Sequence, residues 1–169
     1  GYRSQFGSGI NIQLSLLARK KLLEFKEEHG IDPGYIQAGY LFLAQNNEEM
    51  KNLTLANAMQ QRYGLMDAVL VSNDDIAGLN PHVNIQNVIG GSYCQSDGFI
   101  DPKNILNGYL SSSQKNGVDI IFNTLVSGIK CTAGNIVYIE TTSGCYSADK
   151  YVNAAGAWAG IVADLAGET

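Results

Sequence analysis

The stretch Asn153-Ala154-Ala155-Gly156-Ala157-Trp158-Ala159-Gly160 carries the strongest fold signal in the chain. It follows Tyr151-Val152 and precedes Ile161 to Ala166, which predicts a strand that runs into a helix. Every residue of the stretch except Trp158 is small, so another group can approach the main chain closely. Free amides at a helix start favour an anion such as a phosphate, and Trp158 offers a flat apolar wall with one N–H donor. The same small residues would also let the strand and the helix pack against each other.

Helix and strand patterns alternate along the rest of the chain. Apolar residues at helical spacing and the stop signal at Gly30 predict a helix over 10–29. A second helix is expected from Asn46 to about Tyr63, and Asp101-Pro102 predicts the start of a third that closes at Asn116-Gly117. This mixture of elements predicts an α/β or α+β fold. The other expected elements are a helical turn capped by Asn73 or Asp74 and strands at 35–44, 68–71, 88–94, 118–122, 125–131, 136–142 and 145–151.

The composition is that of a folded domain with little charge. Of the 169 residues, 45% are apolar and 16% charged, with a net charge of -5, which disfavours disorder and gives no general attraction for nucleic acid. No apolar run approaches the ~20 residues of a transmembrane helix. The three widely spaced cysteines, Cys94, Cys131 and Cys145, disfavour a zinc site and favour a reducing cytoplasm. We expect all three to be small buried side chains.

Arg3 is the candidate for binding a negatively charged group. It precedes the first helix in a polar, glycine-containing segment, where a guanidinium can hold a carboxylate in a bidentate fork. A solvated arginine near a chain end is the alternative. Asp97-Gly98 is interpreted as a turn and Asp101-Pro102 as a helix cap. The sequence contains no serine nucleophile elbow, no phosphate-binding loop with lysine and no H-E-x-x-H motif.

Taken in order, these segments resemble the FAD-dependent amine and amino-acid oxidoreductases, the superfamily of D-amino-acid oxidase, glycine oxidase and sarcosine oxidase. The resemblance covers nearly the whole chain and is strongest to the sarcosine and proline dehydrogenase branch. The segments that carry it are Arg3 to Phe6, Gly39 to Ala44, Gly90 to Pro102, Asn123 to Ile129 and Val152 to Ala159.

The resemblance implies a partial FAD-binding lobe with a small β-meander and an inserted substrate lobe with an antiparallel sheet. Residues 1–30 would be the N-terminal segment and helix of the FAD lobe, 31–96 the substrate-lobe portion, and 97–169 the FAD-lobe portion with the meander. The family's G-x-G-x-x-G fingerprint and C-terminal part find no match here. We therefore expect an internal fragment that alone binds FAD weakly or not at all and is inactive, because a split site loses its preorganisation.

The resemblance also implies a function. The intact enzyme would oxidise the C–N bond of a small amine or amino acid, of the sarcosine, glycine, proline or D-amino-acid type, by hydride transfer to FAD. Arg3 would meet the flavin face or the substrate carboxylate, and Val126 the adenosine part of FAD through its backbone. Ala154, Ala155, Gly156 and Trp158 would line the cofactor. Two alternatives stay open: a non-catalytic binding or subunit-interaction module on the same scaffold, and a flavoenzyme similar to glycerol-phosphate dehydrogenase. A subunit or homo-oligomer partner is compatible with each.

Overall fold

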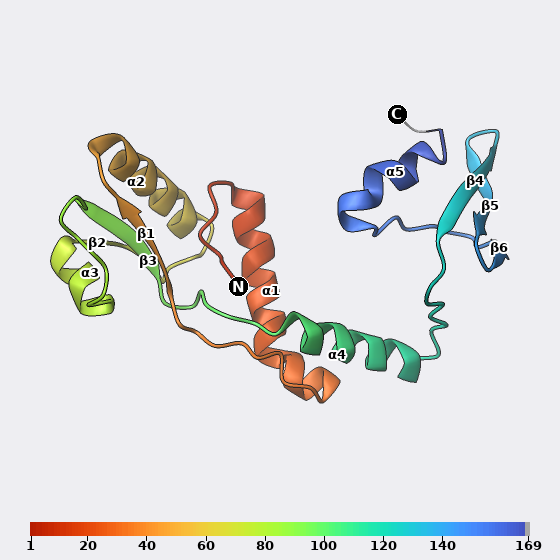
Figure 1. Ribbon diagram of the computed structural model, residues 1–169, viewed down its shortest axis with the longest axis horizontal. Helices are drawn as coiled ribbons and strands as arrows, with labels where there is room; N and C mark the ends of the chain where they lie inside the picture. The colour runs from red at the N-terminus through yellow and green to blue at the C-terminus, as the bar shows by residue number, and fades with distance from the viewer. Residues whose placement is uncertain (168–169) are drawn as a thin grey trace. The chain divides into compact units, whose positions relative to one another are not determined.

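The computed structural model describes residues 1–167 and is shown in Figure 1. The chain divides into two compact units, Gly1–Val118 and Asp119–Thr169. Each unit contains one three-stranded antiparallel sheet together with helices, which confirms the predicted mixed α/β class. None of the helices within residues 1–167 is long and apolar enough to cross a membrane.

The sheet of the first unit has its last strand in the middle. Strand β3 (Gly90–Cys94) pairs with β1 (Tyr40–Ala44) on one side and with β2 (Ala68–Val71) on the other. Cys94 is opposite Tyr40 in one pairing and opposite Ala68 in the other, so the first residues of β1 and β2 both lie beside the last residue of β3. The helices of this unit are α1 (Gly9–His29), α2 (Asn47–Arg62), α3 (Asn73–Leu79) and α4 (Pro102–Lys115).

Small apolar clusters hold the elements of the first unit together. One cluster joins Ile12 of α1 to Ala68 and Cys94 of the sheet, and all three side chains are fully buried. Helix α4 packs on α1 where the ring of Phe25 lies against Gly108. A Cβ atom on Gly108 would lie 2.5 Å from Phe25 Cε1, so only glycine permits this approach. A second cluster consists of Val71, Ile76 and Val88.

The helix ends follow the signals in the sequence, with one correction. Asp101 Oδ1 accepts hydrogen bonds from the amides of Lys103 (2.9 Å) and Asn104 (3.2 Å), which confirms the predicted cap of α4. Gly30, with φ +72°, ends α1 as expected. The prediction that Asn73 or Asp74 caps α3 is wrong. The cap is Ser72, which exchanges side-chain and backbone hydrogen bonds with Asp75 in a capping box.

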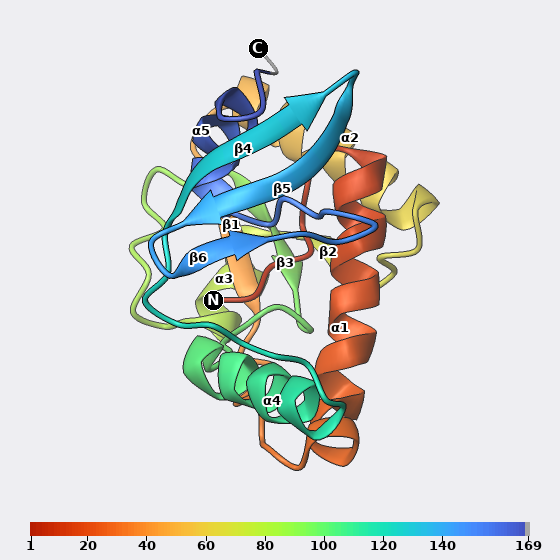
Figure 2. The same ribbon diagram turned by 90° about the vertical axis from the view of Figure 1, so that its right-hand side faces the viewer.

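The second unit contains the predicted meander, in which β4 (Val126–Thr132), β5 (Asn135–Thr141) and β6 (Gly144–Tyr146) pair in chain order (Figure 2). A 3₁₀ turn (Gly156–Trp158) and the short helix α5 (Ala159–Asp164) follow.

Three strand predictions in this region are wrong. Residues 118–122 form no strand, the last strand ends at Tyr146 instead of Tyr151, and the residues before Gly156 are irregular. The Asn153 side chain replaces the expected strand ladder there. Its Nδ2 donates to the Ala159 carbonyl (2.9 Å) and its Oδ1 accepts from the Ala155 amide (3.2 Å).

Burial differs sharply between the two units. Within 119–167 no residue is buried, and the side chains of Val152 and Trp158 are 89% and 67% exposed. One small sheet and one short helix provide too few layers to enclose a core. The expectation of three buried cysteines is therefore wrong: Cys94 in the first unit is buried, Cys131 is half-buried and Cys145 is exposed.

Candidate functional site

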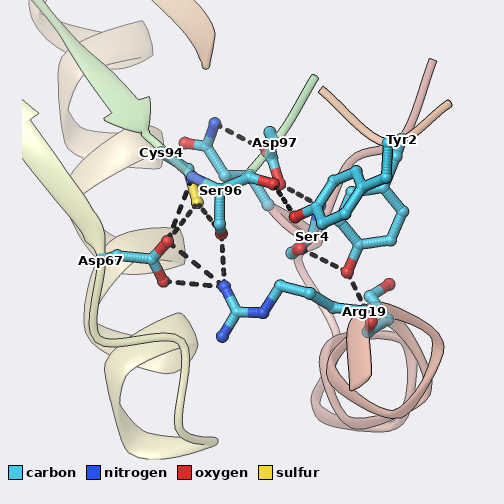
Figure 3. Close-up of polar contacts among 10 residues, drawn as sticks. Tyr2, Ser4, Arg19, Asp67, Cys94, Ser96 and Asp97 are labelled. Atoms are coloured by element: carbon cyan, nitrogen blue, oxygen red, sulfur yellow. Dashed lines mark hydrogen bonds and ion pairs between the residues drawn. The ribbon is translucent and has the colours of Figure 1, made fainter. Parts of the chain in front are cut away.

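The N-terminal segment is held against the end of the sheet by its own backbone. The Tyr2 amide donates to the Gly98 carbonyl (2.8 Å), and the Gly98 amide donates back to the Tyr2 carbonyl (3.0 Å). The Ser4 amide donates to Asp97 Oδ1 (2.7 Å), as Figure 3 shows. Arg3 therefore lies between two fixed residues.

Asp97 is a fully buried carboxylate that accepts hydrogen bonds from N–H groups. Besides the Ser4 amide, it accepts a longer hydrogen bond from Gln5 Nε2 (3.3 Å). The amide group of Gln5 is itself oriented by its neighbours: Nε2 donates to the Tyr40 carbonyl (2.8 Å) and Oε1 accepts from Ser92 Oγ (2.8 Å). One network thus joins the N-terminal segment to the first and last strands of the sheet.

The guanidinium of Arg3 lies among aromatic rings. Its central carbon is 4.8 Å from the ring centre of Phe6, 5.5 Å from that of Phe42 and 5.9 Å from that of Tyr40. Cation–π attraction operates over such distances and fixes the place of the charge without neutralising it. No carboxylate of the described residues lies within ion-pair distance of Arg3. Its charge is therefore available to a ligand.

A hollow of about 500 Å³ adjoins Arg3. This volume is within the range of small-molecule sites, ~300–1,000 Å³. A single positive charge at the margin of a mainly apolar hollow suits a small carboxylate. The other residues that line it are Gly1, Tyr2, Phe6, Asn11, Leu14, Ser15 and Ala18.

A second arginine beside this network is, by contrast, neutralised. Arg19 Nη1 lies 3.2 Å from both carboxylate oxygens of Asp67 and donates to Ser96 Oγ, and Figure 3 shows the three side chains together. Partial burial alone would raise the pKa of Asp67, but hydrogen bonds from Ser96 and Arg19 outweigh burial and lower it. Asp67 therefore keeps its negative charge opposite Arg19, and we assign the pair a structural role.

Two side chains near this pair are kept neutral by their surroundings. Burial raises the pKa of the Cys94 thiol to about 11 and that of the Tyr35 phenol to about 12. A thiol with such a pKa is a poor nucleophile at neutral pH, so Cys94 is a packing residue.

The five predicted cofactor residues lie in the second unit. Val126 is half-buried and lines an apolar hollow of about 270 Å³. Ala154, Gly156 and Trp158 are exposed and Ala155 is half-exposed, so the bend presents bare main chain to the surface. Gly156 has φ +56° and open space where a Cβ would be, so backbone conformation is the reason for this glycine. The other residues lining the hollow are Ile129, Ile136, Ile139, Tyr151, Val152, Asn153, Val162, Ala163 and Ala166.

Sequence reasoning missed the network around Asp97. Asp97-Gly98 was expected to be only a turn, whereas Asp97 is a buried acceptor whose partner Ser4 is 93 positions away. A contact between residues so far apart leaves no local periodicity. One available signal was Ser92, a polar residue inside the predicted strand 88–94 that is buried in the structure.

The family model described as FAD dependent oxidoreductase matches residues 2–169. Mitochondrial sarcosine dehydrogenase of Mus musculus is 28% identical over 165 residues, which are 93% of this chain and 18% of that protein. The mitochondrial pyruvate dehydrogenase phosphatase regulatory subunit of Mus musculus is 26% identical over 152 residues, or 90% of this chain and 17% of that protein. The chain thus spans less than a fifth of the length of these relatives.

The fold is also that of a solved enzyme. The crystal structure of L-proline dehydrogenase from P. horikoshii superposes with a TM-score of 0.89 and 26% sequence identity. The superposition covers 99% of this chain and 44% of that one.

Proposed function

Because the chain belongs to the FAD-dependent oxidoreductase family, we propose that the full-length protein carrying it oxidises the C–N bond of a small amine or amino acid. The observation that supports this most strongly is the family match over almost every residue, with dehydrogenases of sarcosine and proline among the similar proteins. FAD supplies the hydride acceptor when bound, and the residues of this chain would bind and orient the cofactor and the substrate.

The second unit fits part of a flavin nucleotide. Its hollow of about 270 Å³ is smaller than a whole-ligand pocket, and its apolar walls suit an aromatic ring system such as adenine. Val126 would line the adenosine part, and the exposed main chain of Ala154, Ala155 and Gly156 would meet the cofactor beside Trp158. The apolar side chains exposed in this unit are consistent with a surface that a cofactor or further protein covers.

In the first unit Arg3 would bind the carboxylate of the substrate. The guanidinium has no acidic partner within the described residues, and aromatic rings hold it at the margin of the hollow. An arginine in such a place can orient a carboxylate through two parallel hydrogen bonds. With its carboxylate held by Arg3, the ligand would have its amine group in a defined position, and apolar side chains would surround its remaining carbon atoms.

A non-catalytic subunit-interaction module is the second candidate. One observation favours it: a regulatory subunit is among the similar curated proteins, at nearly the same identity as sarcosine dehydrogenase. In that case the hollow beside Arg3 would bind a ligand without turnover.

The proposal is tested on the purified full-length protein. Its FAD content is measured after denaturation, and its activity with a redox dye is assayed with sarcosine, glycine, proline, D-amino acids and glycerol 3-phosphate. We expect about one FAD per chain and oxidation of at least one amino acid. Replacing Arg3 by Gln should raise KM for that substrate, whereas the same change at Arg62, an exposed arginine on α2, should not.

A protein without flavin and without turnover of any compound would favour the regulatory module. Turnover of glycerol 3-phosphate alone would contradict C–N oxidation. The cytoplasmic location is part of the proposal and is checked by cell fractionation, because the two mouse proteins are mitochondrial by name.

A further inference from the structure

We propose that Asp97 is a positioning residue for Arg3, and that its buried carboxylate fixes the guanidinium where a ligand carboxylate binds. The inference rests on the proposed function, because it assigns the hollow beside Arg3 to a small carboxylate. Asp97 would not touch the ligand. It would act through the backbone that carries Arg3.

The carboxylate of Asp97 has an unusual environment. The residue is fully buried, and no lysine, arginine or histidine in residues 1–167 forms an ion pair with it. Buried acidic groups are normally paired, since removing them from water is costly. Here two N–H donors, from Ser4 and Gln5, take the place of a cation. Both donors belong to the residues that directly follow Arg3.

The backbone on either side of Arg3 is therefore fixed. Tyr2 exchanges two hydrogen bonds with Gly98, and Ser4 is held by Asp97 itself. Tyr2 and Ser4 are buried, at 8% and 0% exposure, whereas Arg3 between them is half-buried. Holding Tyr2 and Ser4 in place therefore fixes the backbone of Arg3 between them.

The same carboxylate also fixes part of the wall around the guanidinium. Gln5, which donates to Asp97, donates as well to the carbonyl of Tyr40. The rings of Tyr40 and Phe42 are 5.9 Å and 5.5 Å from the guanidinium carbon of Arg3. A loss of the Asp97 contacts would thus loosen the arginine and one of its ring neighbours together.

The arrangement leaves the charge of Arg3 free. Arg19 is held by a direct ion pair with Asp67 and is neutralised by it. Asp97 holds the segment that carries Arg3 through the Ser4 amide and the Gln5 side chain instead, so the guanidinium has no competing carboxylate partner. A ligand carboxylate can therefore form charge-assisted hydrogen bonds with it.

The test measures carboxylate binding apart from turnover. Cyclopentanecarboxylate has no C–N bond and cannot be oxidised by the proposed reaction, so its Kd for the full-length holoprotein is measured by calorimetry. Asp97→Asn retains the shape but places an NH₂ group near one of the two N–H donors. We expect Kd to rise about 10-fold or more, as for loss of a charge-assisted contact. Arg3→Gln should give at least the same rise.

Asp101→Ala is the matched control. It removes another aspartate, the cap of α4, that has no hydrogen bond to the N-terminal segment. It should lower thermal stability and leave Kd within twofold. If Asp97→Asn does not fold, Ser92→Ala decides the matter, because it removes only the hydroxyl that orients Gln5. A rise in Kd of about 3-fold is expected for that loss.

Three results would overturn the inference. The first is an unchanged Kd in Asp97→Asn, or in Ser92→Ala if Asp97→Asn does not fold. The second is an equal rise in Kd in Asp101→Ala, and the third is a wild-type protein that does not bind cyclopentanecarboxylate. The outcome is distinguishable from that of the proposed function. Carboxylate binding that depends on Asp97, without oxidation of any amine, would support the inference and contradict the proposed function. Amine oxidation without carboxylate binding would do the reverse.

Discussion

Among the glycines of residues 1–167, Gly98 is the one at which the structure leaves least space for a side chain. Gly98 pairs with Tyr2 in one backbone bridge, and the next residue, Phe99, pairs with Ile36 in another. A Cβ atom on Gly98 would be 2.0 Å from the Ile36 carbonyl oxygen and 2.7 Å from the Ala38 nitrogen. Ordinary contacts begin at 3.4 Å. Because φ of Gly98 is not positive, the requirement for glycine is one of space alone.

We predict that Gly98→Ala destabilises the pairing of these segments by about 3 kcal/mol. Forcing a methyl group into a filled site costs ~1–3 kcal/mol. The clashing atoms here belong to the backbone and cannot rotate away, so the upper end applies. At about 1.4 kcal/mol per factor of ten, the opened state becomes roughly 100-fold more populated.

Hydrogen exchange of the full-length protein measures this population locally. Peptides containing the amides of Tyr2, Ile36 and Phe99 should exchange about 100-fold faster in Gly98→Ala. Gly78→Ala is the matched control, because α3 has open space at Gly78 and alanine favours a helix by ~1 kcal/mol. It should not accelerate exchange in these peptides. Exchange in Gly98→Ala within twofold of the wild type would refute the close approach of the three segments.

Three further predictions concern the first unit. Phe25→Ala should lower the free energy of unfolding by about 3–5 kcal/mol in denaturant titrations, because the buried ring packs edge-on against Tyr109 and its removal leaves a cavity. A cost below 1 kcal/mol would contradict this packing. Asp101→Ala should cost about 1 kcal/mol through loss of the α4 cap, measured in the same way, and Asp101→Asn, which keeps a capping oxygen, should cost much less. Cys94 should resist iodoacetamide at pH 8 in peptide mapping until the protein unfolds, because burial raises its pKa to about 11. The thiol of the unfolded chain ionises at a lower pH than the thiol of the folded protein, so the free energy of unfolding should fall as the pH rises from about 9 to 11. Rapid alkylation of the native protein would disprove the burial of Cys94.

Local signals in the sequence predicted the elements that depend on local chemistry. Asp101-Pro102 and Gly30 marked the ends of their helices because capping involves residues only a few positions apart. The predicted strands at 125–131 and 136–142 likewise form the first hairpin of the meander, with Ala133 and Gly134 between them. The predicted strand at 118–122 does not form, since an apolar run becomes a strand only where a partner strand is available.

The candidate site was predictable only in part. Arg3 was identified as a charge in a polar segment, but the rings of Tyr40 and Phe42 that surround it come from a strand nearly forty positions later. The role of Asp97 depends on its contact with Ser4, which no local pattern encodes. The small residues of the bend before α5 were predicted to let another group approach the main chain, and in the structure Ala154 and Gly156 are exposed and Ala155 is half-exposed. Whether the residues of the bend and Val126 contact FAD stays a prediction.

Flavin reduction by an amine in a single turnover tests the central claim most directly. The full-length holoprotein is mixed anaerobically with each amino acid in turn, and the flavin absorbance near 450 nm is followed. The account predicts that at least one small amino acid bleaches the flavin and that cyclopentanecarboxylate, which lacks the C–N bond, does not. A flavin that dithionite reduces but that no amine bleaches would contradict C–N oxidation by this protein.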